Sequence, residues 1–356
     1  MERKKKLVLL REKIDKIDNE IISLLNKRAK ICKEIGKLKQ EFGIEEYVPE
    51  REFKILEKVE SKAKDMPPKY MRSIFNDIIS ACRSLERKLK VCYLGPEGSF
   101  THLAAREKFG IGTNYIALKT IEDIFEEVNE GKADYGVVPI ESSTEGTVTT
   151  TLDMFIRYNI KIVGEILLKI NHCLLSKYSK DDIKVLYSHP QAFAQCRKWL
   201  RENLPNVELR ECSSTSEAAR IASKEKNSGA IASKIAAEIY SLKVIEEGIQ
   251  DYKENYTRFL IIGNHEARKS GNDKTSIVFS IKDKAGALYE ILEPFAKLKI
   301  NLTKIESRPS RQEPWDYYFF LDFQGHKDDA KVKKALKEVE EKCVFLKVLG
   351  SYPSNL

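Results

Sequence analysis

LVLLREKIDKIDNEIISLLNKRAKICKEIGKLKQEF, residues 7–42, repeats its apolar side chains at steps of three and four. This spacing is typical of one long helix that packs along a seam. Where the seam reaches position 28, the register requires an apolar residue, and the chain has Arg28. A guanidinium on a packed seam costs free energy unless an anion meets it. The apolar members of the seam are Leu7, Leu10, Ile14, Ile17, Ile21, Leu24, Ile31, Ile35, Leu38 and Phe42.

Two other cations can be placed relative to Arg28. Lys39 lies eleven residues later, which on an ideal helix is about 20° round the axis and roughly 16 Å along it. Positions 24–32 hold no acidic residue, so Arg28 and Lys39 can clamp a small dianion between them. Arg11 is roughly 25 Å from Arg28 along the helix and reaches the same site only from a second copy of the chain. The alternative is that Arg11 and Lys39 are solvated and Arg28 extends out of the seam to water.

Composition and charge describe the class of protein. The chain has 356 residues, 42% hydrophobic and 33% charged, as expected for a globular protein of more than one domain. Its net charge of +8 lies entirely in residues 1–90, which hold 24 Lys and Arg against 16 Asp and Glu. The first domain is therefore expected to handle an anion. Nucleic acid is the less favoured explanation, because the basic residues after Arg3-Lys4-Lys5-Lys6 alternate with acidic ones and aromatics are few.

Cysteine usage and hydropathy bear on the compartment. Seven cysteines without a C-x-x-C pair favour reduced thiols and a cytoplasmic protein. The apolar run after Lys6 is too short for a signal peptide. The sequence has no run of about 18 apolar residues, so no membrane span is predicted.

Residues 1–90 are predicted to form three helices. The first ends near Gly43, a loop spans 44–49, the second helix carries Arg51 to Val59, and the third runs from about Lys69 to Lys88. Three helices of such unequal length do not close a core alone. Dimerisation through the long helix would cover the side of the core that these helices leave open.

This domain resembles the all-helical chorismate mutase family, in which two chains intertwine and each site borrows an arginine from the other chain. The resemblance implies that Arg28 and the partner's Arg11 hold two carboxylates, while Lys39 and Glu86 flank the ether oxygen of chorismate. The rearrangement to prephenate is unimolecular and needs no nucleophile or cofactor. The residues that carry the resemblance are Arg11, Arg28, Lys39, Arg51, Glu52 and the stretch ISACRSLE at 79–86.

Four positions add detail to this resemblance. Arg51 and Glu52 are implied to support the site. Glu86 stands where some relatives have Gln, and because a carboxyl donates to the ether oxygen only when protonated, activity should fall as pH rises. Val48 stands where some relatives have an Asp that contacts the substrate hydroxyl, and valine has no group to make that contact.

The sequence pattern changes in residues 91–265, where short apolar segments typical of strands alternate with capped helices. Val91–Leu94 and Tyr135–Ile140 are predicted strands, and Thr120-x-x-Asp123 predicts a capped helix start. Such alternation indicates an α/β arrangement, here long enough for two lobes with a ligand cleft between them. Nucleotide-binding glycine motifs and clustered metal ligands are not found. Four scattered histidines, taken singly, are more typical of structure than of catalysis: His102, His172, His189 and His265.

This region resembles prephenate dehydratase, a family with two lobes similar to periplasmic binding proteins. The family removes the ring hydroxyl and a carboxylate of prephenate together, giving phenylpyruvate, CO2 and water without a cofactor. The resemblance implies that Thr257 donates to the departing hydroxyl or positions the donor, that Ser188 and Gln195 line the cleft, and that Arg258 holds an anion or the loop. The matching stretches are 94–104, 133–150, 188–195, 229–237 and 255–263.

Glu141 and Ser142 are expected to bind substrate at the same cleft. Relatives usually read Glu-Asn at this strand end, and this chain reads Glu141-Ser142. Serine still forms hydrogen bonds but has a shorter reach and no amide donors. The site is therefore expected to be intact and retuned.

Residues 266–274 are predicted to form a charged linker, followed at 275–356 by a βαββαβ order typical of a ferredoxin-like module. The module resembles the ACT domain, which senses amino acids. The resemblance implies that Gly286-Ala287-Leu288, at a helix start with free N–H groups, and Glu306-Ser307-Arg308-Pro309 bind phenylalanine as an inhibitor.

The sequence therefore predicts a multidomain protein: an all-α intertwined mutase domain (1–90), a two-lobed α/β dehydratase domain (91–265), a linker (266–274) and an α+β ACT domain (275–356). Its predicted function is a bifunctional, at least dimeric enzyme of phenylalanine biosynthesis that needs no metal or cofactor. Two alternatives remain. The mutase domain could serve only for dimerisation, or the whole chain could be a non-catalytic sensor of aromatic ligands.

Overall fold

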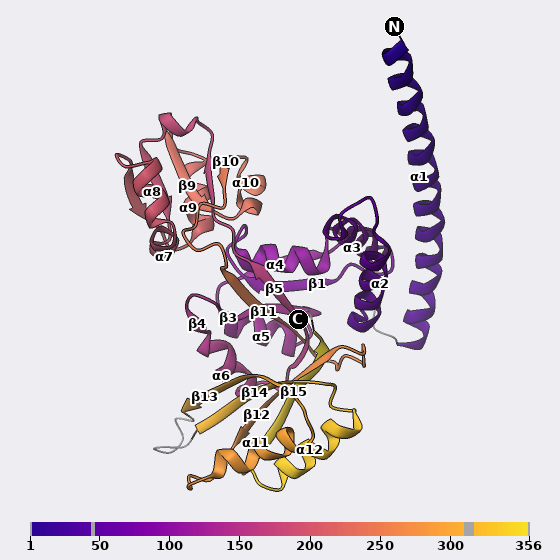
Figure 1. Ribbon diagram of the computed structural model, residues 1–356, viewed down its shortest axis with the longest axis vertical. Coiled ribbons are helices and arrows are strands. Elements are labelled where there is room, and N and C mark those ends of the chain that lie inside the picture. Colours follow the sequence, from indigo (N-terminus) through magenta and orange to yellow (C-terminus); the bar gives the residue numbers. More distant parts are fainter. Residues whose placement is uncertain (1, 44–46, 310–316, 355–356) are drawn as a thin grey trace.

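The computed structural model describes residues 2–43, 47–309 and 317–354 (Figure 1). Of the predicted loop at 44–49, residues 44–46 lie outside the described residues. The first domain consists of three helices: α1 (Glu2–Phe42), α2 (Pro49–Lys62) and α3 (Pro68–Ser84). A proline opens both short helices, where its fixed φ and missing N–H are tolerated. The third helix ends at Ser84, four residues before the predicted end.

Helix α1 stands apart from the rest of the chain along most of its length (Figure 1). Its predicted seam is exposed in the single chain: Ile14 is 56% exposed, Ile21 47% and Leu24 62%. A helix with such an uncovered apolar face needs a partner to cover it. Where α1 does pack, it runs beside α3, and Arg28 lies opposite Ile78 while Gly36 lies opposite Glu86. In both pairs the second residue comes 50 positions after the first. The two segments therefore advance in the same direction, and the helices are parallel.

The first lobe of the second domain is built on one mixed sheet of order β2-β1-β3-β11-β5, with β4 paired to β3. Strand β1 is parallel to β2 and β3, whereas β11 is antiparallel to β3 and β5. The predicted capping box of Thr120 and Asp123 opens α5. The elements of this lobe are β1 (Lys90–Leu94), α4 (Phe100–Phe109), β2 (Asn114–Leu118), α5 (Ile121–Asn129), β3 (Tyr135–Ser142), β4 (Gly146–Thr147), α6 (Thr149–Arg157), β5 (Lys161–Lys169) and β11 (Tyr256–Gly263).

The second lobe is inserted between β5 and β11, so the chain crosses between the lobes at 170–172 and again at 248–255. Its sheet has the order β10-β6-β9-β7-β8. The elements of this lobe are β6 (Cys173–Ser176), η1 (Lys180–Asp182), β7 (Val185–Ser188), α7 (Pro190–Gln195), α8 (Arg197–Asn203), β8 (Glu208–Glu211), α9 (Thr215–Ala222), β9 (Ser228–Ala232), α10 (Lys234–Tyr240) and β10 (Lys243–Glu247).

The third domain is an antiparallel sheet of order β13-β14-β12-β15 with two helices on the face turned away from the dehydratase domain (Figure 1). Strand β12 already begins at Asp273, inside the predicted linker. The elements are β12 (Asp273–Ser280), α11 (Ala287–Lys297), β13 (Leu302–Pro309), β14 (Tyr317–Gln324), α12 (Ala330–Glu340) and β15 (Phe345–Pro353).

The third domain shares a core with the first lobe. Val278, Phe320 and Leu349 belong to the same buried cluster as Ile162 and Leu260 of the lobe. At Gly350 the backbones of β15 and β5 approach so closely that a Cβ would lie 2.1 Å from the Ile162 carbonyl oxygen. This packing fixes the sheet of the third domain against strands β5 and β11, which carry predicted site residues.

Candidate functional sites

The helical domain brings three of its predicted residues together. The Lys39 Nζ lies 2.8 Å from a Glu86 carboxylate oxygen, with both side chains largely buried. Arg28 donates to the Ile78 carbonyl at 3.3 Å and contacts the Cys32 sulfur at 3.9 Å. Among the described residues, no carboxylate pairs with Arg28. Its charge therefore stays available to an anionic ligand beside the Lys39–Glu86 pair.

Gly36 sets the distance between the two helices at this cluster. A Cβ at position 36 would lie 3.0 Å from both Cα and Cβ of Glu86. Few real Cβ atoms come so close to other atoms, so a larger residue here requires Glu86 to give way by a few tenths of an ångström. Gly36 therefore lets Glu86 approach Lys39, a role that the helical periodicity does not reveal.

The other predicted mutase residues lie elsewhere. Arg11 is exposed on the free half of α1, and Arg51 is exposed at the start of α2. Glu52 pairs with Arg83, whose side chain is 5% exposed and also donates to the carbonyl of Phe109 in α4. The Glu52–Arg83 pair thus joins the helical domain to the first lobe. Arg83 lies in the stretch 79–86 that carries the family resemblance, but its contacts could not be predicted, because its partners lie 31 and 26 residues away in the chain.

Thr257 and Ser142 share one face of the first lobe. They are direct neighbours across the β3–β11 ladder, so their side chains lie on the same side of the sheet. The Ser142 hydroxyl lies 3.1 Å from the Thr144 hydroxyl, which in turn lies 3.4 Å from the amide nitrogen of Gln195 in the second lobe. Within the part of the chain that the structure describes, the Thr257 hydroxyl has no hydrogen-bond partner. It is therefore free to act on a ligand between the lobes.

Glu141 and Arg258 lie on the opposite face of the same strands, as the alternation of strand side chains requires. Arg258 donates to Glu165 at 2.8 Å and to Asp322 of the ACT-like domain at 2.6 Å. Burial acts against its charge, yet Tyr352, Asp322 and Glu165 together hold its pKa above the ordinary value. Arg258, predicted to hold an anion or the loop, therefore joins the first lobe to the ACT-like domain through these two carboxylates. Glu141 pairs with Lys304 of β13 at 3.0 Å.

Ser188 also differs from its prediction. Its side chain is fully buried, and the hydroxyl donates to the carbonyl of Ile231 at 2.8 Å. This bond joins strands β7 and β9, so Ser188 is part of the second lobe's core and not of a cleft wall.

Gln195 has two partners that the sequence analysis did not assign to the site. The Nε2 of His172 lies 2.7 Å from the side-chain oxygen of Gln195, and the amide nitrogen of Asn255 lies 3.2 Å from the same oxygen. His172 and Asn255 sit on the two segments that cross between the lobes. Burial lowers the pKa of His172. Taken singly along the chain, His172 had looked structural.

The predicted phenylalanine-binding residues divide into two groups. Gly286 precedes α11 with a φ of 83°, and Ala287 and Leu288 open that helix. On β13, Arg308 forms two hydrogen bonds to Asp153 of α6 at 2.8 and 2.7 Å, and Glu306 accepts from Thr147 of β4 at 2.8 Å. Ser307 and Pro309 point to the exposed side of the strand. The stretch 306–309 thus contacts the first lobe of the second domain directly.

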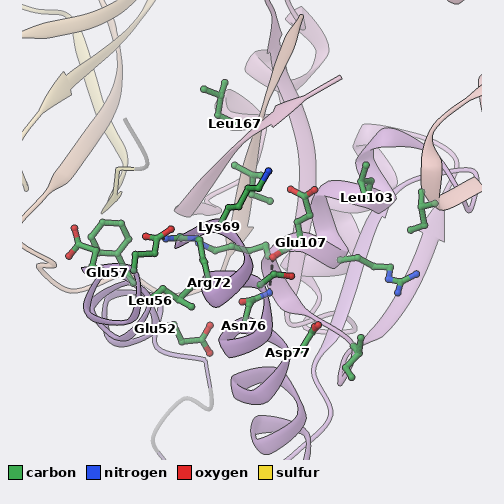
Figure 2. A pocket seen from close by; sticks show the side chains of 18 of the residues that line it. Glu52, Leu56, Glu57, Lys69, Arg72, Asn76, Asp77, Leu103, Glu107 and Leu167 are labelled. Atoms are coloured by element: carbon green, nitrogen blue, oxygen red, sulfur yellow. Dashed lines mark hydrogen bonds and ion pairs between the residues drawn. The ribbon is translucent and has the colours of Figure 1, made fainter. Parts of the chain in front are cut away.

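A groove of about 1020 Å³ lies between α2, α3, α4 and α10. Figure 2 shows that the basic Lys69 and Arg72 and the acidic Glu57 and Glu107 all line it. Its charges are mixed, and Arg72 is paired with Glu60. Of the predicted site residues it contains Glu52 alone. The groove does not coincide with either predicted active site.

Comparisons with known proteins agree with this division. Residues 10–87 match the family Chorismate mutase type II, residues 91–267 match Prephenate dehydratase, and residues 275–341 match ACT domain. A bifunctional chorismate mutase/prephenate dehydratase of Aquifex aeolicus is 50% identical over 353 residues, 98% of this chain and 98% of the relative. This chain belongs to the bifunctional chorismate mutase/prephenate dehydratase family. A member from Pseudomonas aeruginosa is 43% identical over 98% of this chain and 97% of its own length.

The solved structures extend the agreement to the fold of this bifunctional enzyme's last two domains. A prephenate dehydratase of Arthrobacter aurescens, solved in complex with L-Phe, is 34% identical with a TM-score of 0.69, and the match covers 75% of this chain and 90% of that one. The predicted family and fold class are confirmed. No helix in the described ranges is long and apolar enough to cross a bilayer. Across residues 2–43, 47–309 and 317–354, no group of three or more His, Cys, Asp or Glu could hold a metal ion.

Proposed function

We propose that the chain rearranges chorismate to prephenate in its helical domain and converts prephenate to phenylpyruvate at the junction of its two lobes. The observation that carries the first activity is Arg28, a cation on a packed seam with no carboxylate partner among the described residues. A dicarboxylate substrate would compensate it, and a domain used for dimerisation alone would not need it. Lys39, held by Glu86 at 2.8 Å, is placed to meet negative charge that develops on the breaking ether bond.

The second copy of the chain completes this site. In a continuous α1, Arg11 is roughly 25 Å from Arg28, so one small molecule cannot bridge them within one chain. The exposed seam of α1 is the surface on which the partner packs, in a homodimer or a larger assembly. The partner's Arg11 then holds the second carboxylate. The seven free cysteines support a cytoplasmic location.

Mixed dimers test the shared site. We expect Arg11→Ala and Arg28→Ala each to lower mutase kcat/KM by about 10²- to 10³-fold, the loss typical of a charged hydrogen bond to a bound carboxylate. After the two inactive variants are unfolded together and refolded, half of the dimers are mixed and each has one intact site, which restores about a quarter of the wild-type activity. No recovery would mean that both arginines act within one chain.

The dehydratase step requires a proton at the departing hydroxyl. One proton and the prephenate dianion give phenylpyruvate, CO2 and water as the ring becomes aromatic. The free hydroxyl of Thr257 supports its role as donor or relay to that oxygen, with Ser142 beside it. Gln195 faces this group from the other lobe. The carboxylate that is lost leaves its electron pair in the ring as the C–O bond breaks.

Thr257→Val removes the hydroxyl and keeps the shape of the side chain. We expect phenylpyruvate formation to fall by about 10²- to 10⁴-fold, the usual share of a positioned proton donor, while mutase activity is unchanged. Thr257→Ser should recover much of the rate. Equal loss of both activities in the valine variant would indicate misfolding, and an unchanged rate would remove Thr257 from the mechanism.

Phenylalanine binding at the ACT domain restrains the dehydratase. Support comes from β13, where Glu306 and Arg308 are held by Thr147 and Asp153 of the first lobe. An effector that engages these side chains must change their contacts with the lobe, and this links the two sites energetically. Arg308→Ala should blunt inhibition by phenylalanine, measured as a rise in the half-inhibitory concentration. The exposed Lys331→Ala on α12 serves as control, and unchanged inhibition in Arg308→Ala would exclude Arg308 from the sensor.

A further inference from the structure

Three side chains converge where the two lobes join, although they come from distant parts of the sequence. Gln195 ends α7 in the second lobe, and His172 and Asn255 lie on the two crossing segments. His172 is 3% exposed and Asn255 2% exposed. The backbone also fastens this corner, because the Gln195 carbonyl accepts from the Asp251 N–H at 2.7 Å. The cluster therefore has little freedom to rearrange.

The donors in this cluster fix how the Gln195 amide is turned. Its oxygen faces the Nε2 of His172 at 2.7 Å and the amide nitrogen of Asn255 at 3.2 Å. A glutamine oxygen only accepts, so Nε2 of His172 must carry the proton, and the ring is neutral with a bare Nδ1. With its oxygen held from behind by two donors, Gln195 presents its NH2 group to the space shared with Thr144.

Two unsatisfied atoms agree with this arrangement. Within the described part of the chain, Nδ1 of His172 and the side-chain oxygen of Asn255 are buried without a hydrogen-bond partner. Buried polar atoms without partners cost free energy and are rare in folded proteins. Both atoms are the unused acceptors of groups whose donors are committed to Gln195. The cost is understandable if the orientation of Gln195 matters to function.

We propose that His172, assisted by Asn255, is a positioning residue that turns the amide NH2 of Gln195 toward a carboxylate of bound prephenate. The inference rests on the proposed dehydratase function. An NH2 group donates to a carboxylate, whereas a flipped amide would present an oxygen and repel it. Because Thr257 lies two residues after Asn255, the same segment places both the proton donor and the support of Gln195.

Substitutions at position 172 separate orientation from simple packing. His172→Leu removes the donor and keeps an apolar side chain, and we expect kcat/KM for prephenate to fall about 10- to 100-fold, with a raised KM as the larger part. His172→Gln can donate from nearly the same place as Nε2 and should stay within a few-fold of wild type. His265→Leu, at a half-buried histidine beside Tyr135, is the matched control and should not change KM.

A double-mutant cycle with Gln195→Ala shows whether His172 acts through the amide. If it does, His172→Leu adds no further loss of kcat/KM once Gln195 is alanine. The inference fails if the folded His172→Leu enzyme has wild-type kcat and KM, or if the two losses simply multiply. Mutase activity of each full-length variant reports on folding. Wild-type dehydratase rates in Thr257→Val and Gln195→Ala would instead overturn the proposed function itself.

Discussion

Arg28 in the helical domain and Arg258 at the junction of the dehydratase and ACT domains meet opposite surroundings. Arg258 is 11% exposed and lies between Glu165 and Asp322, and Lys274 joins the same cluster through Glu165 at 2.9 Å. Arg28 contacts a carbonyl and a sulfur, and among the described residues it has no carboxylate partner. A cation that the protein compensates holds the fold together, and one that it leaves uncompensated is placed for a ligand.

Replacing each arginine by methionine should separate these roles. Arg258→Met leaves the largely buried Asp322 without its partner, and we expect a loss of about 3–5 kcal/mol in the free energy of unfolding. Arg28→Met should change stability by less than about 1 kcal/mol, because it removes an uncompensated charge from the seam. The same Arg28 variant should lose mutase activity. Thermal unfolding and both enzyme assays measure these effects.

An exposed ion pair provides a reference value for the stability changes of these two variants. Arg157 pairs with Glu122 at 3.0 Å, but both side chains are more than half exposed. Arg157→Met should therefore cost at most about 1 kcal/mol. If Arg28→Met destabilised the protein as much as Arg258→Met, the guanidinium of Arg28 would be structural and the comparison would break down.

Gly36→Ala tests whether the position of Glu86 relative to Lys39 controls mutase activity. Alanine is favoured over glycine in a helix by about 1 kcal/mol, so α1 itself should gain stability. The added Cβ would lie 3.0 Å from the Cα and Cβ of Glu86, however, so Glu86 must give way by a few tenths of an ångström relative to Lys39. Because a displacement of about 1 Å can cost on the order of 10²-fold in rate, a shift of this size should cost about a few-fold. We expect lower mutase kcat with unchanged dehydratase activity.

Dehydratase activity in the Gly36→Ala variant is the internal control, since the substitution is remote from Thr257. Gly43→Ala separates backbone strain from crowding, because Gly43 has a φ of 62° and no atom of the described residues lies within 4 Å of its missing Cβ. A Gly36→Ala enzyme with full mutase activity would show that the distance between α1 and α3 does not control catalysis.

The sequence predicted elements and local motifs well because these depend on neighbours in the chain. The periodicity of residues 7–42, the Thr120–Asp123 cap and the βαββαβ order all describe interactions within a few residues. The same reasoning found Arg28 as an unusual cation on a seam. Helical geometry placed Lys39 on nearly the same face of the helix as Arg28, and the family resemblance added Glu86 to that predicted site.

The role of Arg258 could not be read from the sequence, because its partners lie 93 and 64 residues away. From the chain alone, a strand arginine next to Thr257 has the same appearance whether it faces substrate or another domain. Strand alternation puts Thr257 and Arg258 on opposite faces, but only the packing of the ACT sheet shows which face is which. His172 was overlooked for the same reason, since Gln195 reaches it through tertiary structure.

His102 adds a third case, a buried ionisable group that forms no ion pair with a carboxylate of the described residues. The ring stacks on Tyr93 with a centroid distance of 4.6 Å, and its Nδ1 accepts from the Gly98 N–H at 3.2 Å. Burial, with a smaller effect of Arg106, lowers the pKa of His102 from 6.5 to about 4. The folded protein therefore keeps this ring neutral where the unfolded chain would bind a proton.

The pH dependence of stability should report this difference, as the smallest of the expected effects. Because the unfolded chain binds more protons between pH 6.5 and about 4, the contribution of His102 is complete above that window and is lost as pH falls through it. His102→Gln removes the titration. We expect the drop in melting temperature from pH 7 to pH 5 to be smaller in the variant than in the wild-type protein. An equal drop would mean that His102 gains a compensating anion on folding, as Arg258 does, and belongs with the paired cations.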